Sequence, residues 1–259
     1  MKIVVCVKQV PDTAATMTVE EGKISWGDAQ LIINPWDEYA VEAALNIAAT
    51  HGAEVIVLSM GKEDETEAIK HALAMGANDA VLVTDPVLEN LDNVATARIL
   101  AKAIQKIGEV DLAIFGQQSV DTVTGLLPAQ VARVLGWPAL PLVSQFDAIS
   151  PDEGTLRVKR ALEEGKQIVD GKFPAVVSVT KDYGEPRYPS FMGIRKASRA
   201  KYPIWGLADL EMDAPKTVVF WSDVSAPPTR EIVSEIIAGE TPEEKAQNLV
   251  KKIMEEKVL

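Results

Sequence analysis

The segment "DLAIFGQQSVDTVTGLLPAQVARVLG" (111–136) decides the fold class. An apolar run ends at Gly116, a polar and hydroxyl-rich stretch follows, and then comes a helix-like pattern that stops at Gly136. A strand, a turn and a helix in this order form the unit of an α/β protein, and the turn is a common place for nucleotide binding. The turn contains neither a GKS or GKT sequence nor a GxGxxG sequence. It is therefore either a phosphate-binding loop of another kind or an ordinary loop.

The chain before this segment repeats the same alternation. Strands are predicted at 2–10, 54–61 and 79–85, a hairpin at 17–33, and helices at 34–52, 63–77, 93–108 and 122–136. Asn34 can cap the first helix, and Pro35 suits its first turn. Alternating strands and helices favour a parallel sheet with right-handed crossovers and helices on both faces. The sequence therefore predicts a Rossmann-like α/β fold.

The pattern changes after about residue 140. A charged hairpin is predicted at 155–171 and a buried strand at 174–181. Residues 181–228 are rich in proline, aromatic and basic residues, and no long periodic element follows until a last helix at 241–259. A long irregular segment is unusual inside a compact domain. We therefore divide the chain into a nucleotide-binding α/β domain (1–184) and an arm that lies on a partner (185–259).

Composition excludes several classes of protein. The 259 residues carry a net charge of −12, which makes the chain a poor candidate for binding nucleic acid or an anionic membrane. No apolar run approaches the roughly 20 residues that span a bilayer, and the N-terminus is too polar for a signal peptide. We expect no nucleic-acid partner, no membrane insertion, and a location in the cytoplasm or an organelle matrix.

Catalytic side chains do not form an evident constellation. The two histidines lie in helix-like sequence, away from any metal-ligand or Ser–His–Asp spacing, so no metal site is expected. Cys6 lies inside a strand, which favours a packed thiol. The remaining candidates are the strand ends, because ligands of a doubly wound sheet bind outside the carboxyl ends of its strands. Gly61 and Gly116 at two of these ends would let the backbone approach a ligand closely.

The hydroxyl-rich turn offers the most specific chemistry among these strand ends. Ser119, Thr122 and Thr124, together with free N–H groups at the following helix start, could hold phosphate oxygens without a lysine. The alternative is a helix start capped by Asp121 or Thr122, with nothing bound. The residues of the turn alone leave both interpretations open.

Several stretches, in this order along the chain, resemble one family. They are "VKQVPDT" (7–13), "INPWDEYAVEAAL" (33–45), "ALAMGANDAVLV" (72–83), "DLAIFGQQSVD" (111–121), "VKRALEEGKQIVDGKFPAVVS" (158–178) and "EPRY" (185–188). Together they resemble the β subunit of electron transfer flavoprotein (ETF). The resemblance covers essentially the whole chain, and the ordered set is specific although single motifs would mean little.

The resemblance implies a heterodimer with an ETF α subunit and a redox-active FAD, held mainly by α at the interface. It implies an adenine nucleotide α hydrolase-like fold for β, with its own nucleotide: AMP in the common branch, a second FAD in the electron-bifurcating branch. Electrons would pass from flavin dehydrogenases, such as the acyl-CoA dehydrogenases of fatty acid oxidation, to a quinone oxidoreductase. In the bifurcating branch NADH is the donor. The chain would be an electron-carrier subunit without catalytic side chains of its own.

By position, the strand ends and the resemblance give a nucleotide pocket and a partner-docking loop. The pocket residues are Cys6, Asn34, Pro35, Trp36, Asp37, Met60, Gly61, Thr96, Gly116, Gln117, Gln118, Ser119, Val120, Asp121, Thr122, Val123, Thr124, Gly125, Leu126 and Leu127. The docking residues are Arg187, Tyr188, Phe191, Met192, Arg195 and Lys196. Trp36 would approach the flavin or only pack at the interface. Phe191 would be an exposed apolar anchor or be tucked against the domain.

The sequence does not decide between AMP and FAD. Gly125, Leu127 and Pro128 stand where the common branch has polar residues for the phosphate. Thr124 and the stretch "DNVATA" (92–97) resemble the bifurcating branch, whereas "NPWDEYAVEAA" resembles the common one. A stand-alone universal-stress-type nucleotide-binding protein is a third hypothesis, but it would need a glycine-rich phosphate motif that this sequence lacks.

Overall fold

The computed structural model describes residues 1–88, 91–226, 228 and 234–256. Its contacts divide the chain into two units, Met1–Val224 and Ser225–Leu259. Within the described residues, no helix is long and apolar enough to cross a membrane. The predicted division at residue 184 concerns which part lies on a partner, and it stays a prediction.

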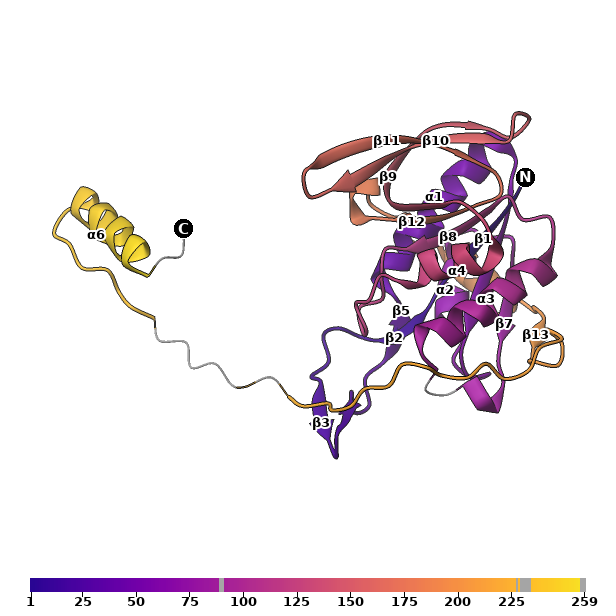
Figure 1. Cartoon of the computed structure of the whole chain (residues 1–259), viewed down its shortest axis with the longest axis horizontal. Coiled ribbons are helices and arrows are strands. Elements are labelled where there is room, and N and C mark those ends of the chain that lie inside the picture. The colour runs from indigo at the N-terminus through magenta and orange to yellow at the C-terminus, as the bar shows by residue number, and fades with distance from the viewer. Residues whose placement is uncertain (89–90, 227, 229–233, 257–259) are drawn as a thin grey trace. The chain divides into compact units, whose positions relative to one another are not determined.

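A nine-stranded sheet forms the centre of the first unit (Figure 1), in the order β11-β10-β9-β12-β8-β1-β6-β7-β13. The strands are β1 (Lys2–Cys6), β6 (Glu54–Met60), β7 (Asp79–Val83), β8 (Leu112–Gly116), β9 (Ala139–Ser150), β10 (Thr155–Leu162), β11 (Gly165–Lys172), β12 (Ala175–Val179) and β13 (Ile204–Trp205). All neighbours from β9 to β13 along this order pair in parallel, whereas β10 pairs antiparallel with both β9 and β11. The predicted Rossmann-like α/β class is confirmed.

Side-chain alternation along the strands creates two cores, one on each face of the sheet. Ile3 and Val5 of β1 join one core with helices α1 (Pro35–His51), α2 (Glu67–Met75) and α5 (Phe191–Ala197). Val4 and Cys6 join the other core with α3 (Asn93–Ile107) and α4 (Leu127–Leu135). Successive side chains of a strand point to opposite faces, so a continuous apolar strand is buried on both sides. Helices on both faces were predicted and are confirmed.

The helix of the opening segment begins later than predicted. We expected it from residue 122, with Asp121 or Thr122 as N-cap, but α4 begins at Leu127 and its N-cap position is Leu126. Val123 and Gly125 have positive φ angles of 53° and 61°, a conformation that does not continue a right-handed helix. The loop between β8 and α4 is therefore five residues longer than the sequence suggested.

The hairpin predicted at 155–171 is confirmed, and the hairpin predicted at 17–33 is confirmed only in part. β10 and β11 form the charged hairpin, and β3 (Thr18–Glu20) pairs with β4 (Lys23–Ser25) around Glu21 and Gly22. The rest of the predicted 17–33 hairpin is wrong, because β5 (Leu31–Ile33) pairs with β2 (Gln9–Pro11). Strand β9 was not predicted. Its pairing with β10 contains two register shifts, which break the alternation that would reveal it.

The C-terminal region contains short elements and one longer helix. In residues 181–228, the described part includes α5 and β13 and is otherwise mostly irregular, as predicted. In the second unit, α6 (Pro242–Glu255) begins as predicted, because the Thr241 hydroxyl accepts a hydrogen bond from the N–H of Glu244 at 3.1 Å. The predicted end of this helix, at 257–259, lies outside the described residues.

Candidate functional site

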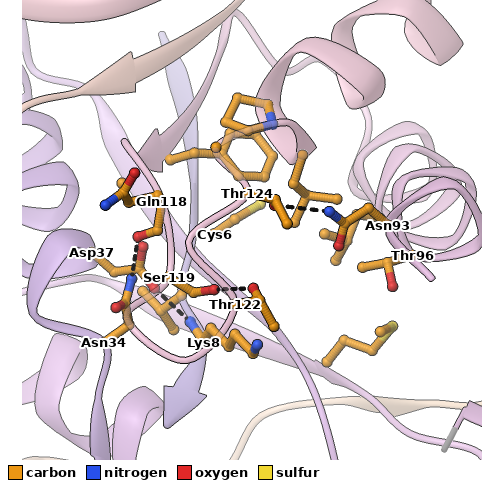
Figure 2. A pocket seen from close by; sticks show the side chains of 18 of the residues that line it. Cys6, Lys8, Asn34, Asp37, Asn93, Thr96, Gln118, Ser119, Thr122 and Thr124 are labelled. Atoms are coloured by element: carbon orange, nitrogen blue, oxygen red, sulfur yellow. Dashed lines mark hydrogen bonds between the residues drawn. The ribbon is translucent and has the colours of Figure 1, made fainter. Parts of the chain in front are cut away.

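A cavity of about 280 Å³ lies at the carboxyl ends of β1, β6 and β8, bordered by the first turns of α1, α3 and α4 (Figure 2). Twelve predicted pocket residues line it: Cys6, Asn34, Asp37, Met60, Thr96, Gly116, Gln118, Ser119, Thr122, Thr124, Gly125 and Leu127. Eight others lie outside its lining: Pro35, Trp36, Gly61, Gln117, Val120, Asp121, Val123 and Leu126. The cavity occupies the place where a doubly wound sheet binds ligands.

Asn34 fastens the hydroxyl-rich loop to the start of α1. Its side chain is 1% exposed, and its Nδ2 donates to the carbonyl of Gln118 at 2.9 Å. Its Oδ1 accepts from the N–H of Val120 at 3.1 Å. The prediction that the Asn34 side chain caps α1 is wrong, because its oxygen accepts no hydrogen bond from a backbone N–H of the helix start. Instead, it satisfies two backbone groups of a loop that is distant in sequence.

Asp37, in the first turn of α1, is buried beneath the cavity. Its Oδ2 accepts from the backbone N–H of Lys8 at 2.7 Å, and the N–H of Gly116 and the Asn34 side chain also donate to it. Burial raises the pKa of the Asp37 carboxyl to about 7, although these hydrogen bonds and the Lys8 charge oppose the rise. Burial, and then the Asp37 charge, raise the pKa of the Cys6 thiol. Cys6 is thus a packed thiol, as its place in a strand suggested.

Gly116 makes the close packing of α1 against β8 possible. A Cβ atom at this position would lie 2.7 Å from both the carbonyl carbon and the oxygen of Trp36, and would also collide with Asp37 Oδ1. We expected Gly116 to give a ligand close access to the backbone. The space beside it is filled by the start of α1, so the glycine serves the approach of a helix to a strand.

The loop presents polar groups suited to an anion. The hydroxyls of Ser119 and Thr122 are 2.7 Å apart, and Lys8 Nζ lies 2.6 Å from Asp121 Oδ2. The other carboxylate oxygen of Asp121 is buried and has no hydrogen-bond partner within the described structure. No described side chain caps α4, so the N–H groups of Leu127 and Ala129 remain available, while Pro128 has no N–H. Lys8, which is paired with Asp121, the two hydroxyls, which bond to each other, and the helix start are the donors that a phosphate would meet here.

The opposite side of the cavity is formed by the start of α3. Asn93 Nδ2 donates to the Thr124 hydroxyl at 2.8 Å, which joins α3 to the loop, and Thr96 lies one turn further along the helix (Figure 2). Between the two polar sides, the lining is apolar. It includes Leu58, Met60, Leu88, Leu91, Leu100, Phe115 and Leu127. An apolar body with polar groups at its rim suits a heterocyclic base joined to a phosphate.

Nine residues of the lining were not among the predicted pocket residues: Val7, Lys8, Leu58, Leu88, Leu91, Asn93, Leu100, Phe115 and Pro128. Lys8 was within reach, because it lies near the carboxyl end of the strand predicted at 2–10, and among the described residues it is the only cation that borders the cavity. Asn93 was also within reach, since it stands at a predicted helix start. The leucines of the apolar wall were not, because nothing distinguishes them from ordinary core leucines.

The predicted docking residues lie in and before α5. Phe191 is 81% exposed and Tyr188 93% exposed, so Phe191 is not tucked against the domain. Met192, Arg195 and Lys196 are also exposed. Arg187 differs from the others, because its guanidinium is paired internally with Glu42 of α1. The exposed members form an apolar tip beside two cations.

Comparison with known proteins gives matches over most of the chain. A family described as "Electron transfer flavoprotein domain" matches residues 27–210. The electron transfer flavoprotein subunit beta of Thermoanaerobacterium thermosaccharolyticum is 36% identical over 98% of both chains, and that of Clostridium acetobutylicum is 36% identical over 82% of this chain and 81% of the other. The "Caffeyl-CoA reductase-Etf complex subunit CarD" of Acetobacterium woodii is 34% identical over the full length of both.

Proposed function

The chain belongs to the beta subunits of the electron transfer flavoprotein family. On this basis, we propose that it pairs with an ETF α subunit in a heterodimer. An FAD at the α/β interface carries electrons from flavin dehydrogenases, such as an acyl-CoA dehydrogenase, to a quinone oxidoreductase. The β chain holds its own adenine nucleotide, AMP, in the cavity above β1, β6 and β8. The observation that carries this proposal is the loop after β8, which Asn34 fixes and whose hydroxyls face the cavity beside Lys8.

The residues of this chain would hold the nucleotide without reacting with it. Lys8 and the N–H groups at the start of α4 would offset the phosphate charge, and Ser119 and Thr122 would donate to its oxygens. The apolar wall excludes water from the base. The interface FAD, when bound, supplies the redox chemistry, while the protein supplies binding and orientation. Trp36, at the first turn of α1, is the proposed aromatic neighbour of that flavin.

A second FAD in place of AMP is the alternative, and one observation favours it. The cavity reaches beyond the loop to Asn93 and Thr96 of α3, which offer further polar contacts to a longer ligand with two phosphates. In that case the chain would belong to an electron-bifurcating ETF in which NADH supplies the electrons. The similarity to a subunit of a caffeyl-CoA reductase-Etf complex also supports a pairing with an enzyme that acts on a CoA thioester.

The partner dehydrogenase docks on the surface formed by Tyr188, Phe191 and Met192, which we name the docking tip. Large exposed apolar side chains are frequent at the centre of interfaces. Arg195 and Lys196 lie beside the docking tip, on a chain of net charge −12, and would steer a partner with an acidic patch.

Co-expression with an ETF α subunit tests the proposal. We expect a stable heterodimer with the yellow absorption of bound flavin. A soluble, colourless monomer that acquires no flavin with any α subunit would contradict it, and would favour a stand-alone nucleotide-binding protein of the universal-stress type.

A further inference from the structure

Glu42, in the middle of α1, is a buried carboxylate committed to one partner. Glu42 is 8% exposed, and Arg187 donates three hydrogen bonds to its carboxylate. Arg187 Nε donates to Oε2 at 2.7 Å and Nη2 donates to Oε1 at 3.0 Å, which is the two-pronged geometry that arginine forms with carboxylates. Such pairs combine strength with a fixed orientation.

The third bond fixes the main chain. The backbone N–H of Arg187 donates to Oε2 of Glu42 at 3.0 Å, so the carboxylate holds both ends of the arginine residue. Arg187 Nη2 also donates to Asn46 Oδ1 at 2.7 Å, one turn further along α1. Tyr188, the first residue of the docking tip, follows directly in the chain. The backbone that leads into the docking tip is therefore held to α1.

The charge of Glu42 is favoured despite its burial. Burial opposes the ionised form, but the hydrogen bonds and the charge of Arg187 outweigh it, and the pKa of the Glu42 carboxyl is lowered. The hydrogen bond to Glu42 likewise raises the pKa of Arg187. Both groups are thus charged at neutral pH. Removing one partner of such a pair is costly, because it leaves the other charge without compensation.

A second attachment holds the far side of the docking tip. The Ser190 hydroxyl caps α5 by accepting from the N–H of Gly193 at 2.9 Å. A Cβ atom at Gly193 would collide with the carbonyl oxygen of Ala74, so α5 lies directly against the end of α2. The exposed side chains of the docking tip therefore stand between two attachment points, one on α1 and one on α2.

We propose that Glu42, acting through Arg187, is a positioning residue that sets the conformation of the docking tip for the partner dehydrogenase. This inference rests on the proposed docking function. It assigns Arg187 to internal support, which leaves Arg195 and Lys196 as the cations that face a partner. Helix α1 then supports two sites. Its first turn holds the cavity loop, and its middle holds the docking tip.

Glu42→Gln in the complete heterodimer tests the proposal, because glutamine keeps the shape and removes the charge. Hydrogen–deuterium exchange of peptides covering 185–192 should become at least about tenfold faster, the loss expected for charged hydrogen bonds. Arg187→Lys, which keeps the charge but not the two-pronged geometry, should give a smaller increase in the same peptides. Asp170→Asn is the matched control, because Asp170 forms a similar pair with Arg157 on the β10–β11 hairpin, and it should leave these peptides unchanged.

Electron transfer gives a second readout, with a purified acyl-CoA dehydrogenase reduced by butyryl-CoA as the probe. Glu42→Gln should raise the KM for the ETF several-fold, with kcat and flavin content unchanged. If hydrogen–deuterium exchange of residues 185–192 in Glu42→Gln stays within about twofold of wild type, the positioning role is wrong, whatever the electron-transfer kinetics show. If Phe191→Ala has no effect on transfer while Glu42→Gln still accelerates exchange, the docking function fails and the positioning of the segment stands.

Discussion

Replacement of Gly116 by alanine should damage the site through a single methyl group. The new Cβ would lie 2.7 Å from two backbone atoms of Trp36 and closer still to Asp37 Oδ1. Real Cβ atoms do not approach backbone atoms this closely, so either the start of α1 or the end of β8 must move. Both movements disturb the hydrogen bonds from Lys8 and Gly116 to Asp37.

The expected cost is the sum of three effects. Overpacking in a close-packed core costs about 1–3 kcal/mol. Weakening one hydrogen bond to a buried carboxylate costs about 1–3 kcal/mol. Replacing glycine restricts the unfolded chain, which returns about 0.4–1 kcal/mol. Gly116→Ala should therefore lower the free energy of unfolding by about 1–5 kcal/mol.

Gly61→Ala provides the matched control, because Gly61 directly follows the central strand β6, much as Gly116 ends β8. A Cβ there would meet only Glu65 Oε2, at 3.9 Å, which is an ordinary contact. This variant should match wild type or be slightly more stable. Urea unfolding followed by circular dichroism measures both variants. If Gly116→Ala is within about 1 kcal/mol of Gly61→Ala, with equal dependence on urea, the packing argument is refuted.

Three further predictions concern the start of α1 and the docking tip. Asn34→Ala leaves two backbone groups of the loop without partners, so it should lower the free energy of unfolding in urea by about 2–3 kcal/mol. The same variant should lose its nucleotide faster during gel filtration. Asp37 has a folded pKa of about 7 against an ordinary value of 3.8, so the folded state binds more protons between these values and loses stability as pH rises through them. From pH 5 to 7.5 this loss is roughly 2–3 kcal/mol, and Asp37→Asn should remove it from the pH dependence of urea unfolding; an unchanged dependence would contradict the assignment. Phe191→Ala should slow electron transfer from a subsaturating dehydrogenase while flavin content stays the same, measured by stopped flow, and unaffected transfer would exclude Phe191 as the anchor.

Local patterns predicted the sheet and helices because each element carries its own signal. The apolar runs of β1, β6, β7 and β8, separated by helical periodicity, are enough to indicate a parallel sheet covered on both faces. The starts of α1 and α6 were also visible, since Pro35 and the Thr241 cap are local features. The later start of α4 was not, because nothing in the periodicity shows that Val123 adopts a positive φ angle.

The sequence identified many residues of the candidate site, but not the contacts that they make. Asn34 was identified, but its partners are 84 and 86 positions away, and a helix-start pattern cannot indicate them. Gly116 was identified for its small size, but whether a ligand or a helix fills the space beside it depends on the packing of α1. Arg187 was taken as a surface cation, and only the folded chain brings Glu42 to it. Long-range pairings are absent from local sequence patterns.

Identification of the nucleotides in the purified heterodimer tests the central claim most directly. The protein is denatured, and the released compounds are separated and identified by mass and absorption. We predict one FAD and one AMP per heterodimer, with the AMP lost from the Asn34→Ala variant. Two FAD per heterodimer would show that the cavity holds a second FAD and not AMP. A heterodimer with no nucleotide beyond the interface FAD would contradict the assignment of the cavity.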